Sequence, residues 1–114
     1  MRIATINIER GMLACDEALS KVQNEIEILA INKQVKVLKV IHGYGSKGTG
    51  GKIKRELLFL LQTLVKKKKI KDFVPNDRFT QQNEKYSNYF KLYPELLVDS
   101  DLQNLNPGIT VIFL

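Results

Sequence analysis

A glycine-rich segment between an apolar strand and an amphipathic helix constrains the fold of this chain more than any other feature. Residues 42–51 read HGYGSKGTGG and hold five glycines. They follow Val35–Ile41 (VKVLKVI), whose nearly continuous apolar character is typical of an interior strand with both faces covered. Apolar residues then recur at helical spacing, at Ile53, Leu57, Leu60, Leu61 and Leu64. The chain is therefore expected to contain a strand–loop–helix unit in the middle of a sheet.

The remaining segments predict further strands and one more helix. Arg2–Ile8 (RIATINI) alternates as a strand does, Ile70–Val74 (IKDFV) is a short third strand, and Ile109–Leu114 (ITVIFL) is apolar throughout. Between Cys15 and Lys33 the apolar residues lie three and four apart, as in an amphipathic helix. Helical crossovers are right-handed and set the first three strands parallel. We predict one α/β domain over residues 1–114, in the order β-α-β-α-β-(helical excursion)-β with a mixed four-stranded sheet.

The excursion covers Asn76–Asn106, and the strand that follows it is expected to run antiparallel. Thr80 is a candidate cap for a helix that ends at Pro94. A tyrosine-rich helix packs on a sheet more often than it stacks on bases. We therefore expect the aromatic residues of this helix to lie in the core or at its rim: Tyr86, Tyr89, Phe90 and Tyr93.

Composition limits the classes of partner and the compartment. The chain has 114 residues and a net charge of +6, which favours polyanions. The single Cys15 excludes an internal disulfide framework and fits a reducing compartment. The chain has no run of eighteen or more apolar residues, so no membrane span is predicted. The N-terminus reads as a strand and not as a signal peptide. A cytoplasmic monomer with no membrane partner is expected.

The glycine-rich segment has the features of a cradle for a phosphate backbone. Glycines permit close approach of another chain, and free N–H groups at a helix start favour an anion. Lysine and arginine side chains flank the segment, as binding to a nucleic-acid backbone requires. The predicted nucleic-acid-binding residues are Gly43, Tyr44, Gly45, Lys47, Gly48, Thr49, Gly50, Gly51, Lys52, Lys54 and Arg55.

Two other phosphate motifs fit less well. Gly43, Gly45 and Gly48 satisfy the dinucleotide fingerprint G-x-G-x-x-G, but the only acidic candidate at the expected distance, Asp72, lies within a strand. The phosphate-loop motif requires a lysine where this chain has Thr49. A looser contact with a nucleic-acid backbone is therefore preferred.

His42 is the one credible acid/base group beside the cradle. With one histidine and one cysteine, a typical zinc site is excluded and a Ser-His-Asp triad is not expected. The segment also lacks the clustered carboxylates of a two-metal nuclease, so no cofactor is assigned. The run Lys66–Lys69 is interpreted as a solvated helix end, where cations complement the negative end of the dipole.

The segment VLKVIHGYGSKGTGGKIKREL (Val37–Leu57) resembles the hallmark of the Smr (small MutS-related) domain family, a strand followed by His-Gly-x-Gly, a Thr-Gly and a basic helix start. DEAL (Asp16–Leu19) and GITVIFL (Gly108–Leu114) resemble its first helix start and its last strand. The family's first strand ends in Leu-Asp-x-His, where this chain has Ile6-Asn7-Ile8-Glu9. From the family motif His42, Gly43, Gly45, Gly48 and Gly50 carry over, and Glu9 is a candidate substitute base.

The resemblance implies an α/β sandwich similar to the C-terminal domain of the third bacterial translation initiation factor. It also implies DNA or RNA binding, with nicking endonuclease activity in some members, in repair, recombination or ribosome-linked RNA handling. We therefore predict nucleic-acid binding with weak nicking that uses His42. The alternative is a protein-interaction module without nuclease activity, which uses the tyrosine-bearing excursion.

Overall fold

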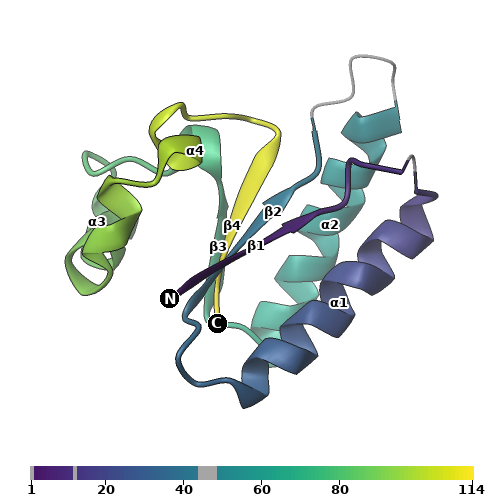
Figure 1. Ribbon diagram of the computed structural model, residues 1–114, viewed down its shortest axis with the longest axis horizontal. Helices are drawn as coiled ribbons and strands as arrows, with labels where there is room; N and C mark the ends of the chain where they lie inside the picture. The colour runs from purple at the N-terminus through teal and green to yellow at the C-terminus, as the bar shows by residue number, and fades with distance from the viewer. Residues whose placement is uncertain (1, 12, 44–48) are drawn as a thin grey trace.

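A four-stranded mixed sheet lies in the middle of the molecule (Figure 1). The computed structural model describes residues 2–11, 13–43 and 49–114, with the backbone only at Thr49 and Gly50. The spatial order is β1-β2-β4-β3, with β2 parallel to β1 and with β4 antiparallel to both β2 and β3. This confirms the α/β class and the antiparallel last strand. The strands are β1 (Ile3–Asn7), β2 (Val37–Ile41), β3 (Asp72–Pro75) and β4 (Ile109–Phe113).

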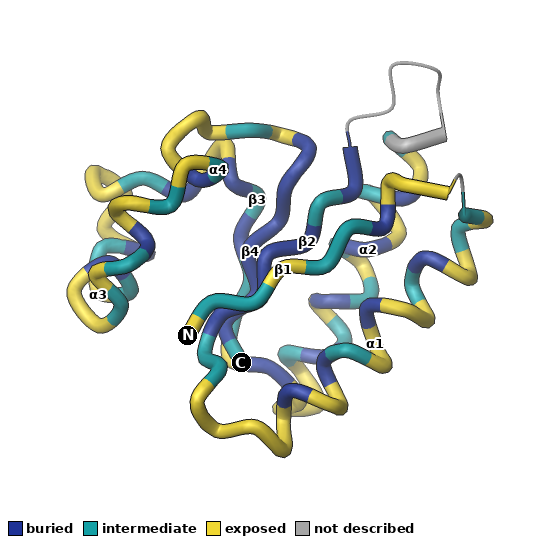
Figure 2. The backbone as a smooth tube through the Cα atoms, in the orientation of Figure 1, coloured by how far each residue is buried: buried dark blue, intermediate teal, exposed yellow. Residues whose placement is uncertain are grey.

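Two long helices cover one face of the sheet, α1 (Cys15–Ile31) and α2 (Thr49–Lys66) (Figure 1). Their apolar stripes pack against β1, β2 and β4 in one continuous core. Each fully buried aliphatic side chain in such a core contributes about 1.5–3 kcal/mol. The buried stripe residues include Val22 and Ile26 of α1 and Leu57 and Leu61 of α2. β2 and β4 are buried on both faces, as their sequences predict (Figure 2).

The excursion covers the opposite face with four short helical elements: η1 (Asn76–Arg78), α3 (Glu84–Leu92), η2 (Pro94–Leu97) and α4 (Ser100–Gln103). Tyr86 and Phe90 are buried, and the Tyr89 ring stacks on Phe113 of β4 with centroids 3.6 Å apart. The aromatic residues of α3 therefore pack on the sheet, as predicted.

Several sequence-based boundaries are wrong. The third strand is Asp72–Pro75 and not Ile70–Val74, because it begins only where it pairs with Phe113 of β4.

Two further differences concern helix starts. The side chain of Asn83, not Thr80, caps α3 by accepting from the Lys85 N–H, because Thr80 lies in the preceding turn and its carbonyl accepts from the Asn83 N–H. Helix α2 begins at Thr49, so Thr49, Gly50 and Gly51 lie in its first turn and not in the loop. In the first case the chain offers two capping residues close together. In the second, two glycines lie in the first turn of a helix although glycine has a low helix propensity.

A buried ion pair joins the excursion to the sheet. Lys39 of β2 is 6% exposed, and its Nζ lies 2.9 Å from Asp99 Oδ2 and 2.8 Å from Asp101 Oδ2. Asp99 also caps α4 by accepting from the Asp101 and Leu102 N–H groups. The charge of Lys39 thus fixes α4 over the middle of the sheet. In the part of the chain that the structure describes, no helix is long and apolar enough to cross a membrane.

Candidate nucleic-acid interface at the end of strand β2

The C-terminal ends of β1 and β2 meet the start of β4 at one end of the sheet. The Ile8 N–H donates to Ile41 O at 2.9 Å, which holds the end of β1 against β2. The N–H groups of His42 and Gly43 both donate to Gly108 O, at 2.9 and 3.0 Å. The carbonyl of one glycine before β4 therefore anchors the residues that follow β2. Ligand sites in such sheets lie beyond the carboxyl ends of the parallel strands.

His42 is buried at this end of the sheet, with 1% of its surface exposed. Its Nδ1 lies 2.6 Å from Gly43 O and its Nε2 lies 2.8 Å from Thr110 Oγ1. Because a carbonyl only accepts, Nδ1 carries the proton, and in the neutral ring Nε2 accepts from the Thr110 hydroxyl. Burial lowers the His42 pKa below 6.5; the Gly43 hydrogen bond opposes this and the charge of Lys54 adds to it. The imidazole therefore ties β2 to β4 as a neutral group.

This geometry bears on the catalytic role predicted for His42. Both ring nitrogens are engaged inside the protein, and neither faces solvent. Sequence reasoning missed Thr110, which is fully buried in β4. Its only sequence signal is a hydroxyl within an otherwise apolar strand, and that pattern does not identify a partner.

The side chain of Glu9 lies against the Cα of Gly43. The φ of Gly43 is +75°, a left-handed conformation that favours glycine, and an added Cβ would collide with the Glu9 carboxylate. Asn7 sets the turn that carries Glu9, since Asn7 Oδ1 accepts from the N–H groups of Glu9 and Arg10 at 2.9 and 3.0 Å. The exposed Glu9 carboxylate thus lies against Gly43, next in the chain to His42. Here the structure brings together two residues of the predicted site.

The predicted cationic residues have different surroundings. Lys54 is half-buried, and its Nζ donates to Pro107 O at 2.8 Å, which binds α2 to the segment before β4. Lys52 and Arg55 are exposed and lie three residues apart on α2, so they are neighbours on its surface. Gly51 lies in the same first turn, with open space at its Cα. Four predicted residues, Tyr44, Gly45, Lys47 and Gly48, lie outside the described residues, and Thr49 and Gly50 are described by their backbone alone.

A second group of cations lies at the opposite end of the sheet. Lys66 is the last residue of α2, Lys67, Lys68 and Lys69 follow it, and all four are exposed, as predicted. Lys36 O accepts from the Leu114 N–H and the Lys71 N–H donates to Phe113 O, so these two lysines flank the end of β4. Within the described ranges none of these lysines forms an ion pair. Basic charge is therefore not confined to the candidate interface.

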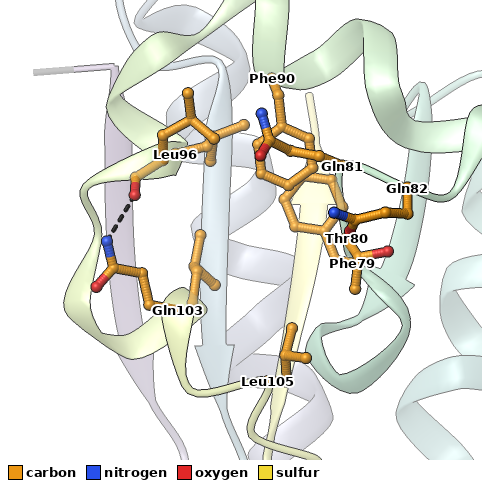
Figure 3. Close-up of a pocket in the computed structure, with 10 residues that line it drawn as sticks. Phe79, Thr80, Gln81, Gln82, Phe90, Leu96, Gln103 and Leu105 are labelled. Atoms are coloured by element: carbon orange, nitrogen blue, oxygen red, sulfur yellow. Dashed lines mark hydrogen bonds between the residues drawn. The ribbon is translucent and has the colours of Figure 1, made fainter.

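The excursion carries a hollow of about 230 Å³ (Figure 3). Phe79 and Phe90, stacked with centroids 4.3 Å apart, form part of its wall. Gln103 donates to Leu97 O at 2.7 Å, and none of the described residues that line the hollow is charged. Its lining fits an uncharged group better than a phosphate.

The end of β2 thus defines a class of site: an α/β sheet end with a left-handed glycine, a basic helix start and the exposed carboxylate of Glu9. Comparisons with protein-family models, with curated proteins and with solved structures found no match. Membership of the Smr family therefore stays a prediction from the residues. Among the described residues no group of three or more His, Cys, Asp or Glu side chains could hold a metal ion.

Proposed function

We propose that the chain binds DNA or RNA at the end of the sheet where β2 ends and α2 begins. The observation that carries the proposal is that Lys52 and Arg55 are neighbours on the exposed surface at the start of a helix of 18 residues. Unpaired N–H groups and the helix dipole attract anions at such a start, and the two cations supply salt-dependent phosphate contacts. The N–H of Gly43 is already bonded to Gly108 O, so it is not one of the donors.

Salt-dependent binding tests this proposal. Fluorescence anisotropy with labelled single-stranded and duplex oligonucleotides, at several salt concentrations, gives the slope of log K against log salt. Each phosphate contact contributes about −0.7 to −0.9 to that slope. The Lys52→Ala/Arg55→Ala variant should therefore bind more weakly and with a slope shallower by about 1.5.

The matched control is Lys66→Ala/Lys67→Ala, which removes the same charge from the opposite end of α2. It should change the slope much less. If the control weakens binding as much as the Lys52/Arg55 variant does, the phosphate contacts are not at this end of the sheet and the proposal is wrong.

The finer proposal is that bound nucleic acid is weakly nicked. Because His42 is buried with both nitrogens engaged, proton transfer is assigned to the exposed Glu9, and His42 positions Gly43 beside it. In a supercoiled-plasmid assay Glu9→Gln should abolish nicking and leave anisotropy binding intact. Equal nicking by wild type and by Glu9→Gln would remove Glu9 from the reaction.

The second candidate function is protein interaction at the excursion. The tyrosines of α3 are turned to the sheet, so the contact surface is the uncharged hollow lined by Phe79 and Phe90. A pull-down that survives nuclease treatment, and that is lost when Gln82→Lys places a charge beside the hollow, would support this function. Binding that depends on nucleic acid would count against it.

A further inference from the structure

No described strand pairs with the outer edge of β1, and the hydrogen bonds to β2 show which of its groups face outward. The Val37 N–H donates to Arg2 O at 3.0 Å, and the Ile8 N–H donates to Ile41 O at 2.9 Å. Residues that bond to a neighbouring strand alternate along a strand, so the even-numbered residues of β1 face β2. The backbone groups that point away from the sheet, and that have no backbone partner among the described residues, belong to Ile3, Thr5 and Asn7.

The two edges of the sheet differ in how they are protected. β3, the other edge strand, has four residues, begins at Asp72 and ends at Pro75. Charges, prolines and short length are the devices by which proteins block edge-to-edge pairing. β1, which lies at the other edge of the sheet (Figure 1), reads IATIN, with five residues, no charge and no proline. One edge of the sheet is closed to another strand and the other is open.

We propose that β1 pairs with β1 of a second copy of this chain, antiparallel and about a two-fold axis at Thr5. In this register Thr5 lies opposite the second copy's Thr5, and Ile3 lies opposite the second copy's Asn7. Every outward-facing residue then meets an outward-facing residue, and each such pair exchanges two backbone hydrogen bonds. A two-fold axis brings the same patch of both copies together, and the two sheets join into one.

The side chains of β1 are self-complementary in the same register. On the face of the sheet covered by α1, Ala4 lies opposite the second copy's Ile6, a small residue against a large one. Both are half-exposed members of the core rim, so pairing buries apolar surface. On the other face the two Thr5 side chains are neighbours, a favourable cross-strand pair. This self-match favours a second copy over an unrelated extended peptide as the occupant.

A groove of about 380 Å³ lies over the excursion face of the sheet, between Ile3, Thr5 and Lys39 on one side and Glu95, Val98 and Asp99 on the other. Three of these residues are charged, and the groove is not at the outer edge of β1, so the dimer contact does not use it. Thr5 itself is exposed. The inference does not depend on nucleic-acid binding, and it replaces the monomer expected from the sequence.

Charge exchange at Thr5 tests the register directly. Sedimentation velocity over a concentration series should show wild type passing from monomer to dimer. Thr5→Lys and Thr5→Glu each place like charges opposite one another, and each should weaken self-association by about tenfold or more. An equimolar mixture of the two should form mixed dimers with an affinity close to that of wild type. Far-UV circular dichroism and thermal unfolding establish that both variants are folded.

The matched controls are Gln62→Lys and Gln62→Glu, on the exposed surface of α2, which carry the same charge changes away from β1. They should dimerise as wild type does. The inference is overturned if wild type stays monomeric at the highest attainable concentration, if the Thr5 variants dimerise as well as wild type, or if their mixture stays monomeric. If Thr5→Lys does not fold, Thr5→Pro replaces it. Proline removes the outward-facing N–H of Thr5, which β2 does not use, and the variant should dimerise less well than wild type.

Discussion

At the residue scale, the buried ring of His42 links proton uptake to unfolding. Burial lowers its pKa, while the unfolded chain has the ordinary value of 6.5. Between the two pKa values the unfolded state holds more protons, so the free energy of unfolding falls as pH falls. The contribution of the neutral ring should be complete above about pH 6.5 and should be lost progressively below it. Urea unfolding in steps from about pH 7.5 to about pH 5 measures this.

The control for this prediction is His42→Gln. The chain has one histidine, so the variant has no imidazole to titrate. It should be less stable by about 1–3 kcal/mol, because the two hydrogen bonds are imperfectly replaced. Its stability should change little over the same pH range. A pH dependence equal to that of wild type would assign the effect to carboxylates and contradict the prediction.

Two glycines of the predicted cradle should respond to alanine in opposite directions. Gly43 has a φ of +75° and lies against Glu9, so Gly43→Ala should lower the free energy of unfolding by about 1–2 kcal/mol. Gly51 is in the first turn of α2 with nothing near a new Cβ, so Gly51→Ala should raise it by about 0.5–1 kcal/mol. Denaturant melts of both variants test the pair. Equal effects of the same sign would show that the glycines have one shared role.

At the scale of elements, the end of α2 has a left-handed lysine where glycine is usual. Lys68 has a φ of +59°. The Lys69 N–H donates to Leu64 O at 2.9 Å and the Lys68 N–H to Val65 O at 3.0 Å, which is the Schellman pattern. The four lysines therefore close the helix in a fixed turn. The composition of the run predicted only a solvated helix end. The turn is made by backbone hydrogen bonds, which four identical lysines do not predict.

Lys68→Gly should therefore stabilise the protein. Glycine adopts positive φ at little steric cost, so the free energy of unfolding should rise by up to about 1 kcal/mol. Lys67→Gly removes the same charge one residue earlier, where the backbone is still bonded back to Thr63, and should destabilise by a similar amount. Thermal melts at one salt concentration compare the two. Destabilisation by Lys68→Gly would show that its side chain makes a contact worth more than the strain.

At the scale of the whole molecule, periodicity predicted the four strands, the two long helices and the buried faces of both, because apolar spacing reports which side chains are buried. It did not predict the short helices η1, η2 and α4. Ile53, Leu57, Leu61 and Leu64 all lie in the core. Phe59 shows the limit, since it adjoins that stripe and is 71% exposed. The candidate site was found through Gly43 and His42, but Thr110 of β4 and Gly108, just before β4, lie about seventy residues further along the chain. Only the folded sheet brings them to His42.

The buried Lys39 tests how the two faces of the sheet depend on each other. Burial alone would lower its pKa, but hydrogen bonds to Asp101 and Asp99 outweigh burial and raise it. Lys39→Met keeps the stem and leaves two carboxylates without a cation. Breaking such a pair from one side costs about 3 kcal/mol, toward the lower end of the usual range because the Asp101 side chain is 48% exposed. Denaturant unfolding measures this loss.

Replacing the whole ion pair should restore most of that stability. In Lys39→Met/Asp99→Asn/Asp101→Asn no charge is left unpaired, and asparagine still caps α4. Arg2→Met, which breaks the exposed pair with Glu95, should change the unfolding midpoint little. In Lys39→Met, amide hydrogen exchange should rise in α4 before it rises in β2 and β4, because the excursion loses its attachment first. Uniform exchange across both would mean that the excursion and the sheet unfold as one unit, with the ion pair serving the whole fold.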